Sequence, residues 1–115
     1  ETGLGQAFSQ SLETKQFAFV DFSIYSLTNE NVIHDGLISF IAHSILNAQD
    51  EVMMVSVLQM PIDGINAIMT KRYNMGKTGE SYLVGPDHLM RSDSFLDPQS
   101  RSAVASFTSP DTGTI

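Results

Sequence analysis

Apolar residues follow two different periods in the first part of the chain. Residues 4–14 carry large apolar side chains at every fourth position, Leu4, Phe8 and Leu12. This is the repeat of one helical face, so a short helix is expected there. Residues 17–25 alternate instead, because every even position is apolar and the odd positions are mixed. A period of two predicts a strand with one apolar face, as in an antiparallel sheet.

Two longer apolar segments follow a polar stretch. Residues 26–36 are predominantly polar and end in Asp35-Gly36, which predicts a loop closed by a turn. Residues 37–46 and 51–60 are apolar on both alternating faces, and only four residues separate them. The short connection predicts a hairpin. Its two strands are expected at the centre of a sheet that is covered on both faces.

The second half of the chain reads as helix, two short strands and helix. Pro61 suits the first turn of a helix that extends to residue 71, because its missing N–H has no partner there. Residues 80–84 and 89–92 are predicted as short strands on either side of a Gly-Pro turn. A last helix is expected from Asp97-Pro98, with Ala103, Val104 and Phe107 as its apolar face. The hairpins favour an α+β fold with an antiparallel sheet.

Composition limits the possible partners. The chain has 115 residues, enough for one domain, and a net charge of −7. An acidic surface repels phosphate, so neither nucleic acid nor anionic lipid is expected as a partner. The absence of cysteine excludes disulfides and thiolate metal sites. No signal peptide is visible, and the start without Met suggests a piece excised from a longer protein.

Candidate catalytic and binding motifs are weak. Gly76-Lys77-Thr78 lacks the earlier glycine of a phosphate-binding loop, since Lys71 stands in that place. The three histidines have no metal-ligand spacing. Asp21 interrupts an aromatic strand, where it either tethers the sheet edge or meets an amine or hydroxyl of a ligand. A hydrolase that uses Asp21 and His43 is a further alternative, which requires the two side chains within hydrogen-bond reach.

Three blocks together resemble a known family. The first is the segment 19–25, FVDFSIY, followed by Phe40-Ile41-Ala42. The second is the segment 57–69, and the third is the long segment 75–94, MGKTGESYLVGPDHLMRSDS. These blocks look like the Cache (extracellular PAS-like) sensor region of bacterial chemoreceptors, sensor kinases and second-messenger enzymes. The resemblance covers residues 17–107.

The resemblance implies a fold, a location and a role. The fold is a PAS-like antiparallel sheet with flanking helices and a small-molecule pocket. The location is the periplasmic or extracellular face of the cytoplasmic membrane, and the role is to convert ligand occupancy into a helix movement across that membrane. The helix and hairpin that usually precede the strand at residue 17 are missing, so a truncated or mid-module fragment is expected. Residues 76–115 would then begin a second, membrane-proximal module.

These considerations lead to a ligand-sensing module without catalysis of its own and without a cofactor. Asp21 and Tyr25 are the expected polar groups of the pocket, and Phe19 and Phe40 its walls. The partners are an unidentified small molecule, a second copy of the chain in a homodimer, and the rest of the receptor in the membrane. No tryptophan is present, so the Arg-Trp-Tyr signature of amino-acid-binding members is absent. The alternative is a structural dimerisation module that binds no ligand.

Arg91 is the last candidate. A half-buried arginine needs acceptors for its planar donors, and Glu80 and Asp93 are the nearest carboxylates in the predicted hairpin. We expect Arg91 to pair with one of them and pin the hairpin to the sheet; an anion clamp for a ligand is the alternative. Residues 80–84 and 89–92 are also expected to cover the open sheet edge, within one chain or between two copies.

Overall fold

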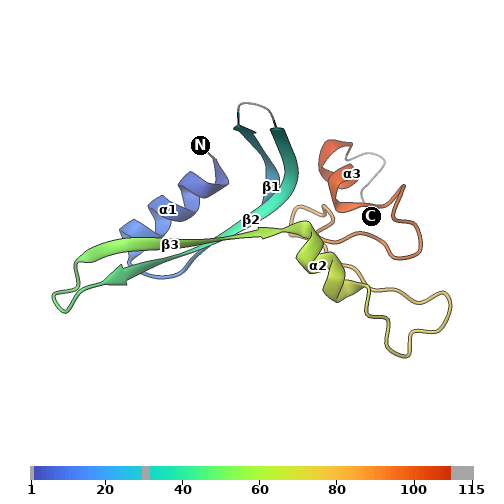
Figure 1. The fold of residues 1–115 in the computed structure, drawn as a ribbon. Coiled ribbons are helices and arrows are strands. Elements are labelled where there is room, and N and C mark those ends of the chain that lie inside the picture. The colour runs from blue at the N-terminus through green and yellow to red at the C-terminus, as the bar shows by residue number, and fades with distance from the viewer. Residues whose placement is uncertain (1, 30–31, 110–115) are drawn as a thin grey trace. The chain divides into compact units, whose positions relative to one another are not determined.

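The computed structural model describes residues 2–29 and 32–109. Its elements are α1 (Gly3–Thr14), β1 (Ala18–Asn29), β2 (Val32–Leu46), β3 (Val52–Pro61), α2 (Ile62–Met69) and α3 (Ala103–Thr108) (Figure 1). The chain divides into two compact units, Glu1–Met60 and Pro61–Ile115. An antiparallel sheet combined with helices agrees with the predicted α+β class. None of the helices in the described ranges is both long and apolar enough to cross a lipid bilayer.

The predicted first helix is confirmed, but it buries a different face. The hydroxyl of Thr2 caps α1 by accepting from the Gly5 N–H at 3.1 Å. At the other end Lys15 takes a left-handed conformation with φ 57°. Ala7 and Ser11 are fully buried, whereas the stripe of larger side chains stays partly exposed. The small side chains are the ones that allow the helix backbone to approach the sheet closely.

The sheet has the strand order β1-β2-β3. β1 and β2 pair antiparallel from Ala18↔Ala42 to Asn29↔Val32. The predicted loop over 26–36 is therefore wrong for its described residues, which continue the two strands; residues 30–31 lie outside the described ranges. Residues 32 and 33 are Val and Ile, and such β-branched residues favour strands. The predicted hairpin of residues 37–46 and 51–60 is confirmed as β2 and β3.

Helix α1 packs on one face of this sheet. The apolar cluster beneath it consists of Ala7, Ala18, Ile38, Phe40 and Ala42, with Val20, Val55 and Val57 packed against it. The expectation that both faces of the central strands are covered does not hold for β3. Its side chains Met54 and Leu58, which alternate with the core valines, are 57% and 59% exposed. β3 also ends the strand order, so it is an edge strand of this sheet.

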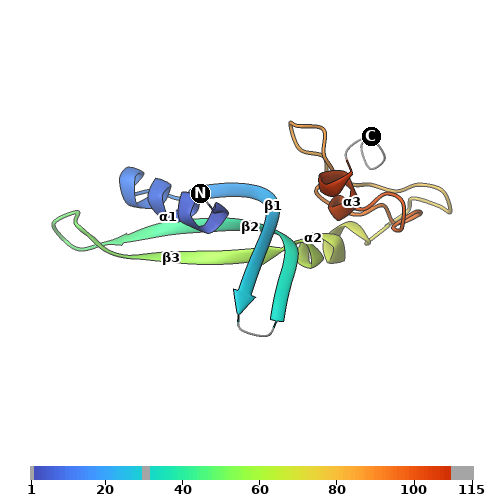
Figure 2. The ribbon, with the colours of Figure 1, turned by 90° about the horizontal axis from the view of Figure 1, so that it is seen from above.

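A β-bulge interrupts the pairing of β1 with β2. β1 advances three residues from Val20 to Ser23 while β2 advances two, from Phe40 to Ile38. The extra residue places Asp21 and Phe22 together opposite Ser39. Bulges bend a strand and increase its twist, and Figure 2 shows β1 and β2 turning together away from the line of β3.

The second unit has little regular structure between its two helices. Pro61 precedes α2 in extended conformation, as expected for a helix that begins at residue 62. The predicted strands at 80–84 and 89–92 are reduced to one isolated bridge, Val84↔Met90. The strand order of the sheet, β1-β2-β3, does not include these segments, and their predicted role at the sheet edge stays a prediction. α3 begins at Ala103 rather than near Asp97, because Ser102 is the residue that caps it.

Two buried serines of β2 provide a matched test of the packing. The Ser44 hydroxyl donates to the Ser11 carbonyl of α1 at 2.6 Å, whereas Ser39 Oγ is buried without a hydrogen-bond partner among the described residues. We expect Ser44→Ala to lower the free energy of unfolding by about 1–2 kcal/mol. Ser39→Ala should leave it unchanged or raise it, because an unpaired buried hydroxyl costs about 1–3 kcal/mol. Urea titration measures both; equal losses would contradict this assignment.

Candidate functional site

The second unit contains a cavity of about 270 Å³ beside α2. It is lined by Asn66, Thr70, Asp93, Ser94, Phe95 and Pro98. Asn66 lies within α2, and Thr70 is the residue that ends the helix. The remaining residues come from the irregular segment before α3. The cavity therefore lies between a regular helix and a chain segment whose position depends on its own hydrogen bonds.

Asp93 is the residue that joins these parts. Its Oδ2 accepts from the Asn66 side-chain amide at 2.8 Å, and its own N–H donates to Asn66 Oδ1 at 2.8 Å. Its Oδ1 accepts from the backbone N–H of Ala103, the first residue of α3, at 2.7 Å. One carboxylate thus connects α2 with the start of α3. Asp93 was predicted as a possible partner of Arg91, but these neutral donors occupy it instead.

Glu80 fixes the segment 94–96, which contributes two residues to the cavity lining. Its Oε2 accepts from the Ser94 hydroxyl at 2.8 Å and from the backbone N–H groups of Phe95 and Leu96 at 2.8 and 3.1 Å. The Ser94 oxygen in turn accepts from the Asp97 N–H. These bonds, the one from Ser94 foremost, hold the pKa of Glu80 below its ordinary value of 4.5. The predicted pairing of Glu80 with Arg91 is therefore replaced by a turn-forming role.

Arg72 fixes the segment that follows α2. Its guanidinium donates to the carbonyls of Gly76 and Gly79. The same group lies over the ring of Phe95, 4.4 Å from its centroid. A cation over an aromatic face is attracted by the ring quadrupole. Arg72 therefore positions one wall residue of the cavity while it satisfies the backbone of a turn.

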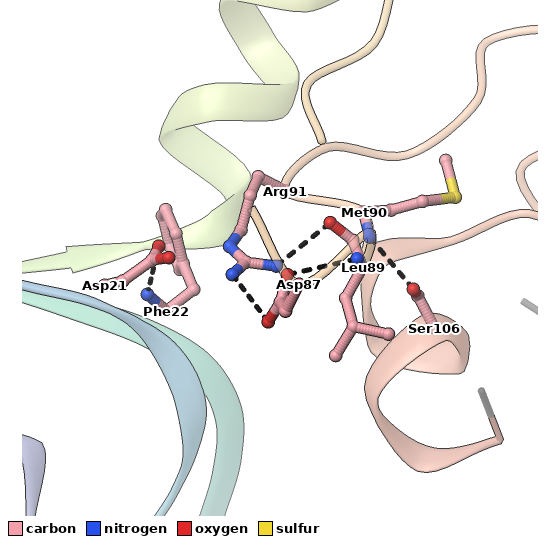
Figure 3. A network of polar contacts seen from close by, with 7 residues as sticks. All are labelled: Asp21, Phe22, Asp87, Leu89, Met90, Arg91 and Ser106. Atoms are coloured by element: carbon pink, nitrogen blue, oxygen red, sulfur yellow. Dashed lines mark hydrogen bonds and ion pairs between the residues drawn. The ribbon is translucent and has the colours of Figure 1, made fainter. Parts of the chain in front are cut away.

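Arg91 pairs with Asp87, which corrects the predicted partner. Its Nη2 lies 2.9 Å from Asp87 Oδ2 and its Nη1 donates to the Leu89 carbonyl at 3.0 Å (Figure 3). The Arg91 hydrogen bond is the main reason that the pKa of Asp87 lies below its ordinary value. The partner is four residues earlier, within the turn at residues 85–88. The alternation of two predicted strands pointed to Glu80 or Asp93 as the partner of Arg91. Only one bridge, Val84↔Met90, forms between these described segments, so the expected strand pairing is absent.

The two residues Met90 and Arg91, which closely follow the turn at residues 85–88, contact α3. The Met90 N–H donates to Ser106 Oγ at 2.9 Å (Figure 3), and the Arg91 guanidinium lies 4.9 Å from the centroid of Phe107. A Cβ at Gly85 would collide with the Arg91 guanidinium, so only glycine allows this close approach. Within the second unit, Arg91 thus connects the turn with the last helix.

The predicted ligand-binding residues of the first unit do not converge on one place. Phe40 is 2% exposed in the cluster under α1. Phe19 pairs with Ile41 and is 57% exposed. Since neighbouring positions of a strand point to opposite faces, Phe19 and Phe40 cannot be walls of one pocket. Tyr25 pairs with Gly36 through its backbone, and its side chain lies outside the described part of the structure.

Asp21 lies at the bulge, where its Oδ1 accepts from the Phe22 N–H at 2.7 Å (Figure 3). This bond stabilises the bulge itself, and a role in ligand binding stays a prediction. His43 packs against Phe17, with the ring centroids 4.0 Å apart. Asp21 faces Ser39, four residues along β2 from His43, which is about 13 Å. The hydrolase alternative therefore lacks the contact that it requires.

Two further observations concern the identity of the site. Among the described residues, no group of three His, Cys, Asp or Glu side chains is placed to hold a metal ion. Comparison with known protein families, characterised proteins and solved structures finds no match. The chemistry of the cavity must therefore be judged from its own residues.

Sequence reasoning missed five of the lining residues, Asn66, Thr70, Ser94, Phe95 and Pro98. Asn66 had a weak signal, because it is an amide on a short helix that otherwise carries mostly apolar residues and one acid. Phe95 and Pro98 gave none, since their place depends on how Glu80 and Arg72 fold the segment. Asp93 was singled out, although for a different partner.

Replacing each member of the Arg91–Asp87 pair separates its contributions. Asp87 is 45% exposed, so Asp87→Asn should cost about 0–1 kcal/mol of unfolding free energy. Arg91→Met removes the bonds of a buried guanidinium and its contact with Phe107, so a loss of about 2–4 kcal/mol is expected. Thermal unfolding of both variants measures this order. Equal effects would show that the ion pair alone accounts for the role of Arg91.

Glu80→Gln is expected to destabilise the chain in a pH-dependent way. The pKa of Glu80 is lower in the folded chain than its ordinary 4.5, so its contribution is fully present above that value. It is lost as the pH falls through the folded pKa. The gap in Tm between Glu80→Gln and wild type should therefore be full above pH 4.5 and close as the pH falls through the lowered pKa of the folded chain. Glu13→Gln, at an exposed carboxylate of α1, is the control, and a gap constant with pH would argue against the role of the charge.

Proposed function

We propose that this chain is the extracytoplasmic small-molecule sensing module of a bacterial transmembrane signalling receptor, of chemotaxis or two-component type. The module has no catalysis of its own. The proposal includes a Cache-like, PAS-related identity and a place on the periplasmic or extracellular face of the membrane. It rests on the resemblance of the sequence blocks together with one structural observation, the cavity beside α2.

The cavity supports sensing because its wall is mechanically connected to both helices of its unit. Asn66 belongs to α2, and Asp93 bonds both to Asn66 and to the first N–H of α3. A molecule that competes for the Asp93 oxygens changes the tie between the two helices. Ligands shift an equilibrium only by their differential affinity for two arrangements. Asp93 is the group at which this difference would arise.

The alternative is a dimerisation module without a ligand. Large apolar side chains that are exposed in the first unit favour this alternative. Phe17, for example, is 73% exposed. A contact with a second chain would remove such side chains from water. The homodimer is compatible with sensing, so the two functions differ only in whether a small molecule binds.

A thermal-shift screen tests the proposal. The 115-residue chain is heated with small acids, amines and sugars, and its mass in solution is measured in parallel. A compound at 100 times its Kd adds about 2.7 kcal/mol, which raises Tm on the order of 10 °C. The expected result is such a shift for at least one compound class.

Thr70→Trp provides the control for the site. Thr70 is exposed and its hydroxyl makes only a local bond to the Ala67 carbonyl at 3.3 Å, so an indole there narrows the cavity without disturbing Asp93. A ligand of the cavity loses its effect in this variant. A stable dimer with no shift by any compound would instead favour the dimerisation module.

A further inference from the structure

The free hydrogen-bonding capacity of the cavity is mostly that of acceptors. An ionised carboxylate offers about four lone-pair positions, and the described contacts of Asp93 use one on each oxygen. The Ser94 hydroxyl already donates to Glu80, so it has only acceptor capacity left. Thr70 likewise donates to a carbonyl. Only the second N–H of the Asn66 amide remains as a donor in the lining.

The charge of the lining has one sign. Asp93 is the single charged residue among the six that line the cavity, and within the described ranges its bonding partners are the neutral Asn66 and Ala103. Arg72 is engaged with the glycine carbonyls and Phe95. A carboxylate that has no cationic partner favours the binding of a positively charged ligand.

The size of the cavity and its apolar lining restrict the ligand further. A cavity of about 270 Å³ lies just under the range of about 300–1,000 Å³ that holds drug-sized ligands. Phe95 and Pro98 supply apolar surface opposite the polar groups. The ligand therefore combines a short apolar body with a donor-rich, positively charged end.

We propose that the cavity beside α2 binds a small primary amine, with the ammonium group donating to Asp93 and its apolar body against Phe95 and Pro98. This inference rests on the proposed sensing function and specifies its ligand class. Anions are disfavoured because they would be desolvated next to the Asp93 charge with a single amide donor available. The ammonium would share Asp93 Oδ2 with Asn66, so the bound amine acts directly on the contact between α2 and the segment before α3.

Three probes with one carbon skeleton test the ligand class. Isobutylamine, isobutanol and isobutyrate are titrated into the full chain, and binding is followed by amide proton–nitrogen correlation NMR. We expect saturable shifts with the amine, including the side-chain amide of Asn66, at least tenfold weaker binding of the alcohol, and no binding of the carboxylate. Shifts confined to residues outside the cavity would overturn the proposal.

Two variants of equal charge separate the role of Asp93 from a general effect of acidity. Asp93→Asn should weaken isobutylamine binding at least tenfold, whereas Asp63→Asn should leave it unchanged. Asp63 is exposed in the first turn of α2 and is not among the cavity residues. If Asp93→Asn does not fold, Thr70→Trp serves instead and should abolish amine binding with the carboxylate intact. Unchanged amine affinity in the folded cavity variants overturns the assignment.

The outcomes distinguish this inference from the function on which it rests. If isobutyrate or a sugar binds, and Thr70→Trp abolishes that binding, the amine is wrong while the sensing cavity stands. If no probe or screened compound shifts any cavity residue, both the ligand class and the sensing proposal fall. Amine binding that requires Asp93 supports both.

Discussion

The second unit depends on side chains to satisfy its backbone. Between α2 and α3 it has a single isolated bridge, so there is no neighbouring strand to bond most of the peptide groups. Buried peptide groups must nevertheless be paired. Arg72 serves carbonyls, Glu80 serves amides, and Asp93 serves the start of α3. These three charged side chains act together with backbone hydrogen bonds of the turns, such as Ser94 N–H to the Arg101 carbonyl and Arg101 N–H to the Asp97 carbonyl, and so help set the shape of the cavity wall.

The first unit is organised by the packing of apolar side chains. Its strands follow apolar alternation, and its helix packs through small residues against the cluster around Phe40. The one departure from regularity, the bulge at Asp21, is stabilised by a carboxylate that bonds the next N–H. The Asp21 carboxylate thus accepts from the Phe22 N–H at the point where the bulge interrupts the pairing of β1 with β2.

This contrast explains which features could be predicted. The hairpin of β2 and β3 and the helices α1 and α2 follow from periodicity, which is a local property of the sequence. The extension of β1 and β2 through residues 26–29 and 32–36 depends on pairing between strands, and turn composition concealed it. Arg91 and Asp93 were recognised as groups that need partners. Their partners were not, because Asp87 lies within the turn and not on a predicted strand, and Asn66 lies 27 residues away from Asp93. The cavity was invisible for the same reason.

Among the residues whose side chains the structure describes, the buried polar ones are Arg91 and six serines: Ser11, Ser39, Ser44, Ser92, Ser94 and Ser106. Serine in most proteins is a surface residue, and its side chain is small enough that the elements on either side stand close together. A larger side chain at such a contact forces the packed elements to shift. Alanine matches serine in size, but it removes the hydrogen bonds that the hydroxyls of Ser44, Ser92 and Ser106 make. Ser39, whose hydroxyl has no partner among the described residues, is therefore the buried serine that evolution can replace by alanine at the least cost.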